Sequence, residues 1–298
     1  MRTLVTGGCG FIGSHLVDAL IDQGHEVYVI DNLSSECNEQ FYFNDNATYL
    51  EEDIRNYDGI KHFFKNIDHV FHLAAESRIQ PTLGRPQETC GTNFMGTCNI
   101  LELSKENNIK KLIYSSTSSG YGLKNKPPLK ETMQRDCLNP YSVTKVAAED
   151  LCKIYYNLWG LKTVSLRYFN VFGERQPIKG IYAPVVGLFI KQKKNNQPLT
   201  VVGDGLQKRD FTYVMDIVSA NLKISMSDND SIFGEVFNVG SGKNLSILDL
   251  AKMIDSNIQF VPERKAESRE TLADTSKIKS VIDWSVTKNI EEWVEDQL

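Results

Sequence analysis

The chain has 298 residues, of which 41% are hydrophobic and 24% charged, and its formal net charge at pH 7 is −5. This composition is ordinary for a globular protein, and a chain of this length can bury a large core without disulfide or metal staples. The acidic balance gives no electrostatic reason to expect nucleic acid or an anionic membrane as a partner. The six cysteines include no C-x-x-C pair and no nearby histidine at metal-ligand spacing, so we predict no metal site and a reducing compartment. Without a signal-peptide pattern or an apolar run of membrane-spanning length, the expected location is cytoplasmic.

The first half of the chain alternates short apolar runs with amphipathic segments. The run at 2–6 predicts a buried strand, and apolar residues from Ile12 to Leu20 recur with a helical period that ends at Gly24. Further strands are expected at 26–30, 69–74, 110–115 and 162–169, and helices at 92–108 and 141–159. Strands alternating with helices predict βαβ units, so the expected fold class is α/β with a Rossmann-like, doubly wound parallel sheet.

The pattern changes at about residue 173, where glycine, proline and basic residues separate shorter elements. The second half therefore predicts a smaller, mixed C-terminal lobe. We expect a Rossmann domain at 1–172 and a mainly substrate-binding lobe at 173–298, with segments around 213–240 as candidates to return to the first domain. The crevice between the two is the natural place for a ligand.

A glycine-rich stretch, TGGCGFIGSHL, follows the first strand and opens the first helix. Gly7, Gly10 and Gly13 allow a tight turn, close approach of the backbone to a pyrophosphate, and close packing of helix on sheet. The N-terminus of the helix then offers free N–H groups and a partial positive charge to the phosphates. This context predicts a dinucleotide site.

Asp31 ends the second predicted strand, eighteen residues after Gly13. A carboxylate there can accept hydrogen bonds from an adenosine ribose, and its charge would repel a 2′-phosphate. The following residues offer no arginine to bind such a phosphate. The sequence therefore favours NAD over NADP.

Tyr141 and Lys145 open the helix predicted after residue 139. Asn139 can cap this helix and Pro140 suits its first position, so the two side chains, at i and i+4, share one face. An ammonium beside a phenol favours the phenolate and would bring its pKa toward working pH. We predict an acid/base pair, with the lysine also a candidate to hold the nicotinamide ribose.

The glycine loop, Tyr141-x-x-x-Lys145 and the serine- and threonine-rich strand end YSSTSSGYG resemble the reaction centre of the short-chain dehydrogenase/reductase superfamily. The whole chain is similar to its extended members, most of all to nucleotide-sugar 4-epimerases acting on UDP-glucose or UDP-N-acetylglucosamine. The stretches that carry this resemblance are IDNLS, DIRN, HLAA, TNFMGT, NPYSVTK, LRYFNVFG, GDGLQKRDFTYVMD and LADTSK.

The resemblance assigns roles to individual residues. It implies that Thr117, Tyr141 and Lys145 are catalytic. It implies cofactor contacts for Gly7, Gly10, Phe11, Ile12, Gly13, Asp31, Asn32, Asp53, Ile54, Leu73, Ala74, Ala75, Asn93, Tyr141, Lys145 and Phe169. On the substrate side it implies Asn170, Arg209 and Arg264 at the diphosphate, and Thr271 at the position that limits the C2 substituent. Ser118 and Ser119 are candidates to hydrogen-bond sugar hydroxyls.

The implied mechanism begins when Tyr141 takes the proton of the sugar 4-OH while hydride leaves C4 for NAD⁺. The 4-keto sugar then turns over in the site, and the hydride returns to its other face. The related 4,6-dehydratases carry Asp-Glu directly after the catalytic threonine, whereas this chain has Ser118 and Ser119. Dehydration is therefore disfavoured and 4-epimerisation of a UDP-hexose is the preferred function.

Two departures from the epimerase pattern concern the substrate. The chain has ERKAESRE in place of Arg-x-Gly-Asp, with Glu267 at the aspartate position. Thr271 is small enough to admit an N-acetyl group, so UDP-glucose, UDP-galactose and their N-acetyl forms all remain candidate substrates.

Other functions on the same scaffold stay open. A uronate epimerase or decarboxylase needs a cation for the C6 carboxylate, for which Arg78 and Arg175 are unassigned candidates. A reductase, or a non-catalytic NAD-binding protein, is a further alternative, although the intact Thr117, Tyr141 and Lys145 argue against the latter. The helices around 91–108 and 141–159 resemble those that form a four-helix dimer interface in this family, so we expect a homodimer.

Overall fold

The computed structural model describes residues 1–180 and 182–298. Its largest unit is a parallel sheet of seven strands in the order β10-β6-β5-β4-β1-β2-β3. The strands are β1 (Arg2–Thr6), β2 (Glu26–Asp31), β3 (Thr48–Glu51), β4 (His69–His72), β5 (Lys111–Thr117), β6 (Thr163–Tyr168) and β10 (Glu235–Val239). The strand order reverses between β1 and β4, as in Rossmann folds, which confirms the predicted doubly wound α/β class.

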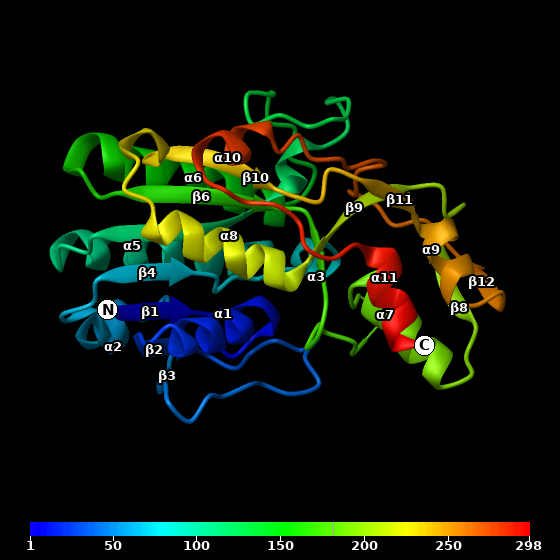
Figure 1. Cartoon of the computed structure of the whole chain (residues 1–298), viewed down its shortest axis with the longest axis horizontal. Helices are drawn as coiled ribbons and strands as arrows, with labels where there is room; N and C mark the ends of the chain where they lie inside the picture. The colour runs from blue at the N-terminus through cyan, green and yellow to red at the C-terminus, as the bar shows by residue number, and fades with distance from the viewer. Residues whose placement is uncertain (181) are drawn as a thin grey trace.

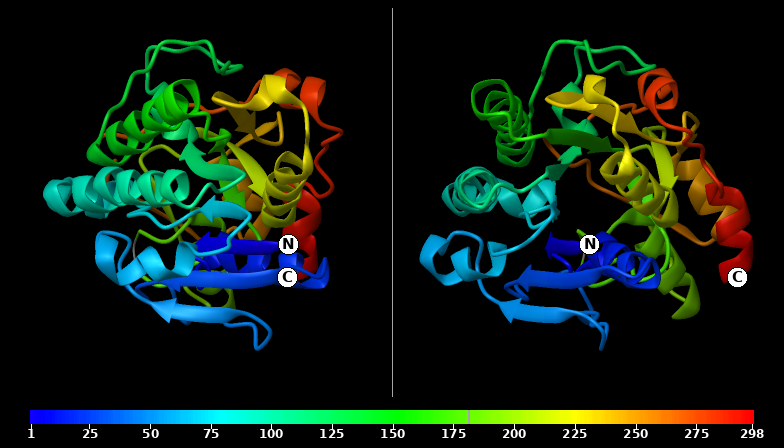
Figure 2. Two further views of the ribbon diagram at one scale, coloured as in Figure 1. Left: turned by 90° about the vertical axis from the view of Figure 1, so that its left-hand side faces the viewer. Right: turned by 60° about the vertical axis from the view of Figure 1, so that its left-hand side comes forward.

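Helices cover both faces of this sheet (Figure 2). One face carries α1 (Phe11–Asp22), α8 (Val214–Met226) and α10 (Ser276–Val281), and the other carries α2 (Tyr57–Ile60), α5 (Thr97–Glu106) and α6 (Pro140–Trp159). Two short 3-10 helices, η1 (Lys61–Phe64) and η4 (Asp230–Ile232), lie in the connections. Because both faces are covered, the central strands are buried along their whole length, for example all six residues of β6.

The start of α6 follows the sequence prediction. The Asn139 side chain accepts a hydrogen bond from the backbone N–H of Ser142 at 2.8 Å, and Ser142 completes a reciprocal capping box. Pro140 occupies the first turn, where its missing N–H costs nothing, and Gly160 ends the helix in the left-handed conformation. This cap fixes the position of Tyr141 in the first turn of the helix.

The helix predicted at 92–108 begins earlier than expected. Helical structure starts with α4 (Pro86–Cys90), continues through a π-helical segment η2 (Gly91–Gly96), and only then becomes α5. Pro86 stands in the first turn of α4, a start signal that the apolar pattern alone did not reveal. The wider π-helical turn falls on the TNFMGT stretch, so the regular period used for the prediction breaks there.

The smaller lobe lies beyond the carboxyl ends of the parallel strands (Figure 1). It contains a three-stranded sheet of β7 (Asn170–Phe172), β9 (Lys208–Tyr213) and β11 (Asn244–Ser246), and a two-stranded sheet of β8 (Leu199–Val202) and β12 (Ile258–Val261). The helices α7 (Val185–Lys194), α9 (Ile247–Ile254) and α11 (Ile290–Gln297) pack with these strands around a separate core. Within 213–240, β10 is an edge strand of the large sheet and α8 packs on one face of that sheet. None of the described helices is long and apolar enough to cross a membrane.

Candidate active site

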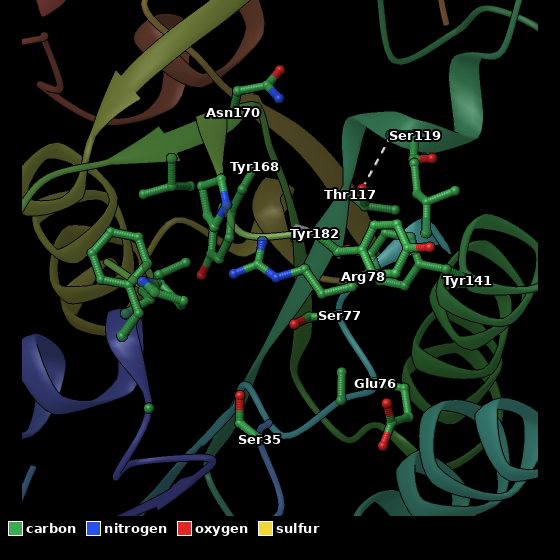
Figure 3. A pocket seen from close by; sticks show the side chains of 18 of the residues that line it. Ser35, Glu76, Ser77, Arg78, Thr117, Ser119, Tyr141, Tyr168, Asn170 and Tyr182 are labelled. Atoms are coloured by element: carbon green, nitrogen blue, oxygen red, sulfur yellow. Dashed lines mark hydrogen bonds between the residues drawn. The ribbon is translucent and has the colours of Figure 1, made fainter. Parts of the chain in front are cut away.

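A cavity of about 480 Å³ lies where the carboxyl ends of the parallel strands face the small lobe (Figure 3). Two short helices at its rim, α3 (Ile79–Gly84) and η3 (Ser118–Tyr121), follow β4 and β5. Of the residues assigned to the site from sequence, only Asp53 and Asn93 are not among those that line the cavity. Segments separated by up to 264 residues in sequence, from Gly7 to Thr271, therefore meet at one site.

The glycine loop closes the cavity at the N-terminus of α1. A Cβ at Gly13 would lie only 2.1 Å from the Gly7 carbonyl oxygen, so any side chain there would force loop and helix apart. At Gly10 the nearest atom to such a Cβ is 3.5 Å away, and the space beside the loop is open to the cavity. The backbone N–H groups at the start of α1 are thus accessible to a phosphate, which fits the dinucleotide site predicted from the motif.

Asp31 lies at the end of β2, next to this loop. Its carboxylate accepts hydrogen bonds from the backbone N–H groups of Cys9 and Leu33, each at 2.9 Å. Burial raises the pKa of Asp31 and these two bonds act against the rise. The carboxylate is therefore held in one orientation at the cavity wall, where it can accept hydrogen bonds from a ribose diol.

Asp53 and Ile54 occupy different positions although they are adjacent in sequence. Ile54 is buried and lines the cavity, as a flank for an adenine ring would. Asp53 is bound instead by the Arg55 guanidinium, at 2.9 and 2.7 Å, and by the Asn32 amide at 3.0 Å. Asp53 therefore holds Asn32 at the rim rather than forming part of the cavity wall itself.

Leu73, Ala74 and Ala75 form the wall that follows β4, and Asn93 supports it from behind. The Asn93 side chain accepts a hydrogen bond from the backbone N–H of Glu76 at 2.8 Å and donates one to the Glu76 carbonyl at 3.0 Å. Asn93 is only 1% exposed, so its amide serves the loop and not the cavity. Asn93, which was predicted as a cofactor contact, instead holds the backbone of the loop that follows β4.

Thr117 and Tyr141 face each other across the cavity rim (Figure 3). Thr117 is the last residue of β5, and its hydroxyl accepts a hydrogen bond from the Ser119 backbone N–H at 3.1 Å. Burial raises the pKa of Tyr141, while hydrogen bonding with Thr117 and the positive charge of Arg78 act against this rise. The Thr117 hydroxyl and the Tyr141 phenol are therefore arranged so that both can hydrogen-bond the same substrate oxygen.

Lys145 lies one helical turn below Tyr141 and is only 3% exposed. Burial lowers its pKa to about 7, and its ammonium group lies 4.3 Å from the centre of the Tyr114 ring. The structure differs here from the sequence prediction, because the cation that opposes the rise in the pKa of Tyr141 is Arg78 rather than Lys145. Proximity along the helix did not reveal that the ammonium turns toward Tyr114.

The substrate-side residues line the part of the cavity formed by the small lobe. The Arg209 guanidinium donates hydrogen bonds to the carbonyls of Lys208 and Arg269, at 3.0 and 3.3 Å, and lies 3.7 Å from the Glu267 carboxylate. Arg264 lies over the Tyr182 ring at 5.6 Å. Both arginines line the same cavity as the glycine loop and Tyr141.

Thr271 and Asn170 lie next to each other in this part of the cavity. The Thr271 hydroxyl accepts a hydrogen bond from the Asp210 N–H at 3.1 Å and lies 3.4 Å from the Asn170 amide oxygen.

Phe169, buried beside Asn170, lines the cavity together with Ser118 and Ser119. No carboxylate therefore follows Thr117 at the position where a 4,6-dehydratase would need its acid.

Several lining residues were not assigned from sequence. Ser35, Glu76, Ser77, Tyr182 and Gln207 come from loops or short elements that have no motif of their own. The two arginines left unassigned from sequence are separated by the structure. Arg78 lines the cavity, whereas Arg175 pairs with Asp18 at 2.7 Å and stacks over Tyr42 outside it.

The fold, the dinucleotide loop and the Thr-Tyr-Lys set together define an extended short-chain dehydrogenase/reductase. The model of the family described as GDP-mannose 4,6 dehydratase matches residues 4–297, and the chain belongs to this family. A putative UDP-glucose 4-epimerase of Methanocaldococcus jannaschii is 36% identical over 98% of this chain and 95% of its own length. A UDP-N-acetyl-alpha-D-glucosaminuronate decarboxylase of Bacillus cytotoxicus is also 36% identical, over 89% of this chain and 84% of its own length.

Solved structures of similar proteins agree with this placement. UDP-glucose 4-epimerase of Thermotoga maritima, solved with UDP-glucose, has a TM-score of 0.92 and 35% identity, covering 99% of this chain and 96% of its own. UDP-glucuronic acid 4-epimerase of Bacillus cereus, solved with UDP-glucuronic acid and NAD, has a TM-score of 0.90 and 33% identity, covering 100% of this chain and 98% of its own. The chain is thus an enzyme of the NAD-dependent nucleotide-sugar epimerase and decarboxylase group.

Proposed function

We propose that the protein inverts C4 of a UDP-hexose through a transient 4-keto sugar, using bound NAD. The observation that carries this proposal is the set of Thr117, Tyr141 and Lys145 at the cavity rim, followed by Ser118 and Ser119 in place of an acid/base pair. This set supports oxidation and reduction at a carbinol carbon and lacks the groups that water elimination would need.

NAD is the cofactor, and this chain offers it a complementary site. The N-terminus of α1 takes the pyrophosphate, Asp31 the adenosine ribose, and Ile54 one side of the adenine. When bound, NAD would supply the acceptor, and then the donor, of the hydride at C4. Lys145, which lines the cavity on the same helix as Tyr141, would hold the nicotinamide ribose.

Tyr141 serves as the general base and then as the general acid. In the oxidation step its phenolate takes the proton of the 4-OH, and in the reduction step the phenol gives a proton back to the new alkoxide. Thr117 orients the same oxygen by hydrogen bonding. Because the proton and hydride are both returned, the cycle needs no external reductant and NAD stays bound.

The diphosphate of the substrate lies with Arg209 and Arg264 in this proposal. The Arg209 side chain is 11% exposed, and the Glu267 carboxylate is 3.7 Å away, beyond the length of a strong charge-assisted hydrogen bond. A phosphate can therefore take the closer place on this guanidinium. Asn170 and Thr271 would contact the sugar or the uridine-side ribose.

The test is turnover of a panel of UDP-, GDP- and dTDP-sugars without added cofactor, with products identified by NMR. The proposal expects C4 inversion of at least one UDP-hexose and none of the GDP-sugars. Absence of C4 inversion with every sugar, despite bound NAD, would rule it out.

We also propose a homodimer formed through the face of α6 that points away from the sheet. Val143, Ile154 and Leu158 on this helix are 50%, 43% and 68% exposed, and Met95 on the neighbouring segment is 54% exposed. Apolar side chains clustered on adjacent helices favour a helix-on-helix contact. Light scattering of the wild type and of Leu158→Glu tests this, and a wild-type monomer at micromolar concentration would contradict it.

A further inference from the structure

Arg78 reaches into the cavity from the segment that follows β4. It is the residue before α3, its backbone is extended, and its guanidinium points into the cavity between Tyr141 and Tyr168 (Figure 3). Its Nε is buried and has no hydrogen-bond partner. Within 1–180 and 182–298, no carboxylate lies within ion-pair distance of Arg78, and the Cys37 thiol and Tyr141 are the polar groups that interact with it.

A guanidinium in this position needs an anion. Arg78 is half-buried, and arginine keeps its proton in proteins, so it cannot reduce the cost of its partial desolvation by becoming neutral. Desolvating a charge without a partner is costly, and charges inside proteins are normally paired, so a ligand of opposite charge would complete this site. A planar guanidinium matches a carboxylate or a phosphate through paired N–H donors.

Other groups of the site can bind the phosphates of the cofactor and of the substrate. The pyrophosphate of NAD has the N-terminus of α1, and in the proposed function the substrate diphosphate has Arg209 and Arg264, which also line the cavity. Arg78 instead interacts with Tyr141, the group that acts on the sugar O4. In a hexose, C6 is two bonds from C4, whereas the diphosphate leaves from C1 on the opposite side of the ring.

We propose that Arg78 binds a carboxylate at C6 of the sugar, so that the preferred substrate is a UDP-hexuronate. This inference rests on the proposed C4 epimerisation and narrows its substrate class from UDP-hexoses to their sugar acids. Arg175, the other candidate, cannot take this role, because it pairs with Asp18 outside the cavity.

The test compares the kcat/KM for UDP-glucuronate with that for UDP-glucose in the wild type, Arg78→Met and Arg78→Lys. Methionine keeps the length of the side chain and removes its charge. Because the readout is the ratio of the two kcat/KM values, any effect of Arg78 on Tyr141 that is the same for both substrates cancels. Arg85→Met is the matched control, since Arg85 lies on the same segment, pairs with Glu36 and Glu88, and does not line the cavity.

We expect the wild type to prefer UDP-glucuronate by at least about tenfold, and Arg78→Met to lower the ratio by about 30-fold or more, as for a lost charge-assisted hydrogen bond. Arg78→Lys should recover part of the ratio, and Arg85→Met should leave it at the wild-type value. A wild type that epimerises UDP-glucose but not UDP-glucuronate would overturn the inference and leave the proposed function intact. An unchanged ratio in Arg78→Met would also overturn the inference. Loss of bound NAD from purified Arg78→Met would overturn it as well, because it would place Arg78 at the cofactor. Failure of the proposed function would look different, with no C4 inversion of any UDP-sugar.

Discussion

The Glu149 carboxylate and the Arg167 guanidinium form two parallel hydrogen bonds, of 2.8 and 2.7 Å, next to the end of β5. Their side chains are 0% and 5% exposed, and the Ser116 hydroxyl, next to Thr117, donates to the same carboxylate at 2.5 Å. Arg167 also lies over the Tyr121 ring at 4.8 Å. The pair therefore links β5, β6 and α6. These contacts hold Thr117 on β5 and Tyr141 on α6 in fixed relative positions.

Removing one member of this pair should cost much more than removing a surface pair. Glu149→Gln leaves Arg167 buried without its counter-charge, so we expect a loss of about 3–5 kcal/mol in the free energy of unfolding by urea. Asp150→Asn is the control on the same helix, because its partner Arg135 is 40% exposed and such pairs contribute about 0–1 kcal/mol. The double variant Glu149→Leu/Arg167→Met should be more stable than Glu149→Gln. Equal losses for Glu149→Gln and Asp150→Asn would show that the buried pair does not stabilise the site.

Gly13 should tolerate no side chain. A Cβ there would lie 2.1 Å from the Gly7 carbonyl oxygen, an atom of the backbone that cannot move without opening the loop. We expect Gly13→Ala to lose bound NAD, measured by absorbance of the purified protein, and to lower the thermal midpoint. Gly84→Ala is the matched control, since no atom lies within 4 Å of its added Cβ. Full NAD occupancy in Gly13→Ala would contradict the assigned geometry of the loop.

Asp31 should set the choice between NAD and NADP. Asp31→Asn removes the charge that repels a 2′-phosphate. Its single amide oxygen can replace only one of the two carboxylate oxygens that accept from the Cys9 and Leu33 N–H groups, so the ratio of the two nucleotide affinities, and not either affinity alone, is the readout. We expect the ratio of NAD to NADP affinity to fall by about tenfold or more in this variant, measured by fluorescence titration of nucleotide-free protein. Glu51→Gln, on the strand paired with β2 and exposed, should leave the ratio as it is in the wild type. A ratio that is the same in all three proteins would refute the role of Asp31.

Lys145 should give the nucleotide-free protein a characteristic dependence of stability on pH. Its pKa is lowered by burial from 10.5 to about 7, so between these values the unfolded chain holds a proton that the folded chain has released. The unfolded state then binds more protons, and the contribution of Lys145 to stability rises with pH through this window. Below pH 7 both states are protonated and the full cost of the buried charge is present.

Lys145→Met should therefore be more stable than the wild type near pH 7, by about 2 kcal/mol or more, and this advantage should shrink as the pH rises toward 10. Urea unfolding at several pH values measures the difference. Lys153→Met, an exposed lysine on the same helix, should show no such trend. A Lys145→Met advantage that does not vary with pH would mean that the folded state keeps the ammonium charged.

The features that sequence revealed correctly are those fixed by short-range chemistry. Asn139 and Pro140 predicted the start of α6 because a cap and a first-turn proline act within one turn of the helix. The strand, turn and helix that carry Gly7 to Gly13, and the strand that ends at Asp31, were predicted for the same reason, since they form one βαβ unit.

The remaining features depend on contacts that no local pattern encodes. Arg78 and Arg175 looked equivalent in sequence, and only the packing of the segment after β4 and the Asp18 ion pair separate them. Glu149 on α6 and Arg167 on β6 pair across two elements, and their separation in sequence matches neither the helix nor the strand period. The early start at Pro86 was hidden because the π-helical segment at 91–96 breaks the helical period.

The requirement for Tyr141 can be tested separately from folding. Tyr141→Phe should lower turnover by about 10²–10⁴-fold while NAD remains bound, because the phenol is lost and the ring is kept. Tyr156→Phe, on the same helix and in contact with Phe233, is the control and should retain wild-type turnover. Tyr141→Phe with wild-type turnover would refute the assignment of the acid/base group.

The central claim is that hydride leaves C4 and returns to the opposite face of the same sugar. UDP-glucuronate and UDP-glucose carrying deuterium at C4 are incubated with the purified protein without added cofactor, and the products are analysed by proton NMR and mass spectrometry. The account predicts a C4 epimer that keeps its deuterium at C4 and all six sugar carbons. A product that has lost this deuterium to solvent, or the absence of a C4 epimer from both substrates while NAD is bound, would contradict it.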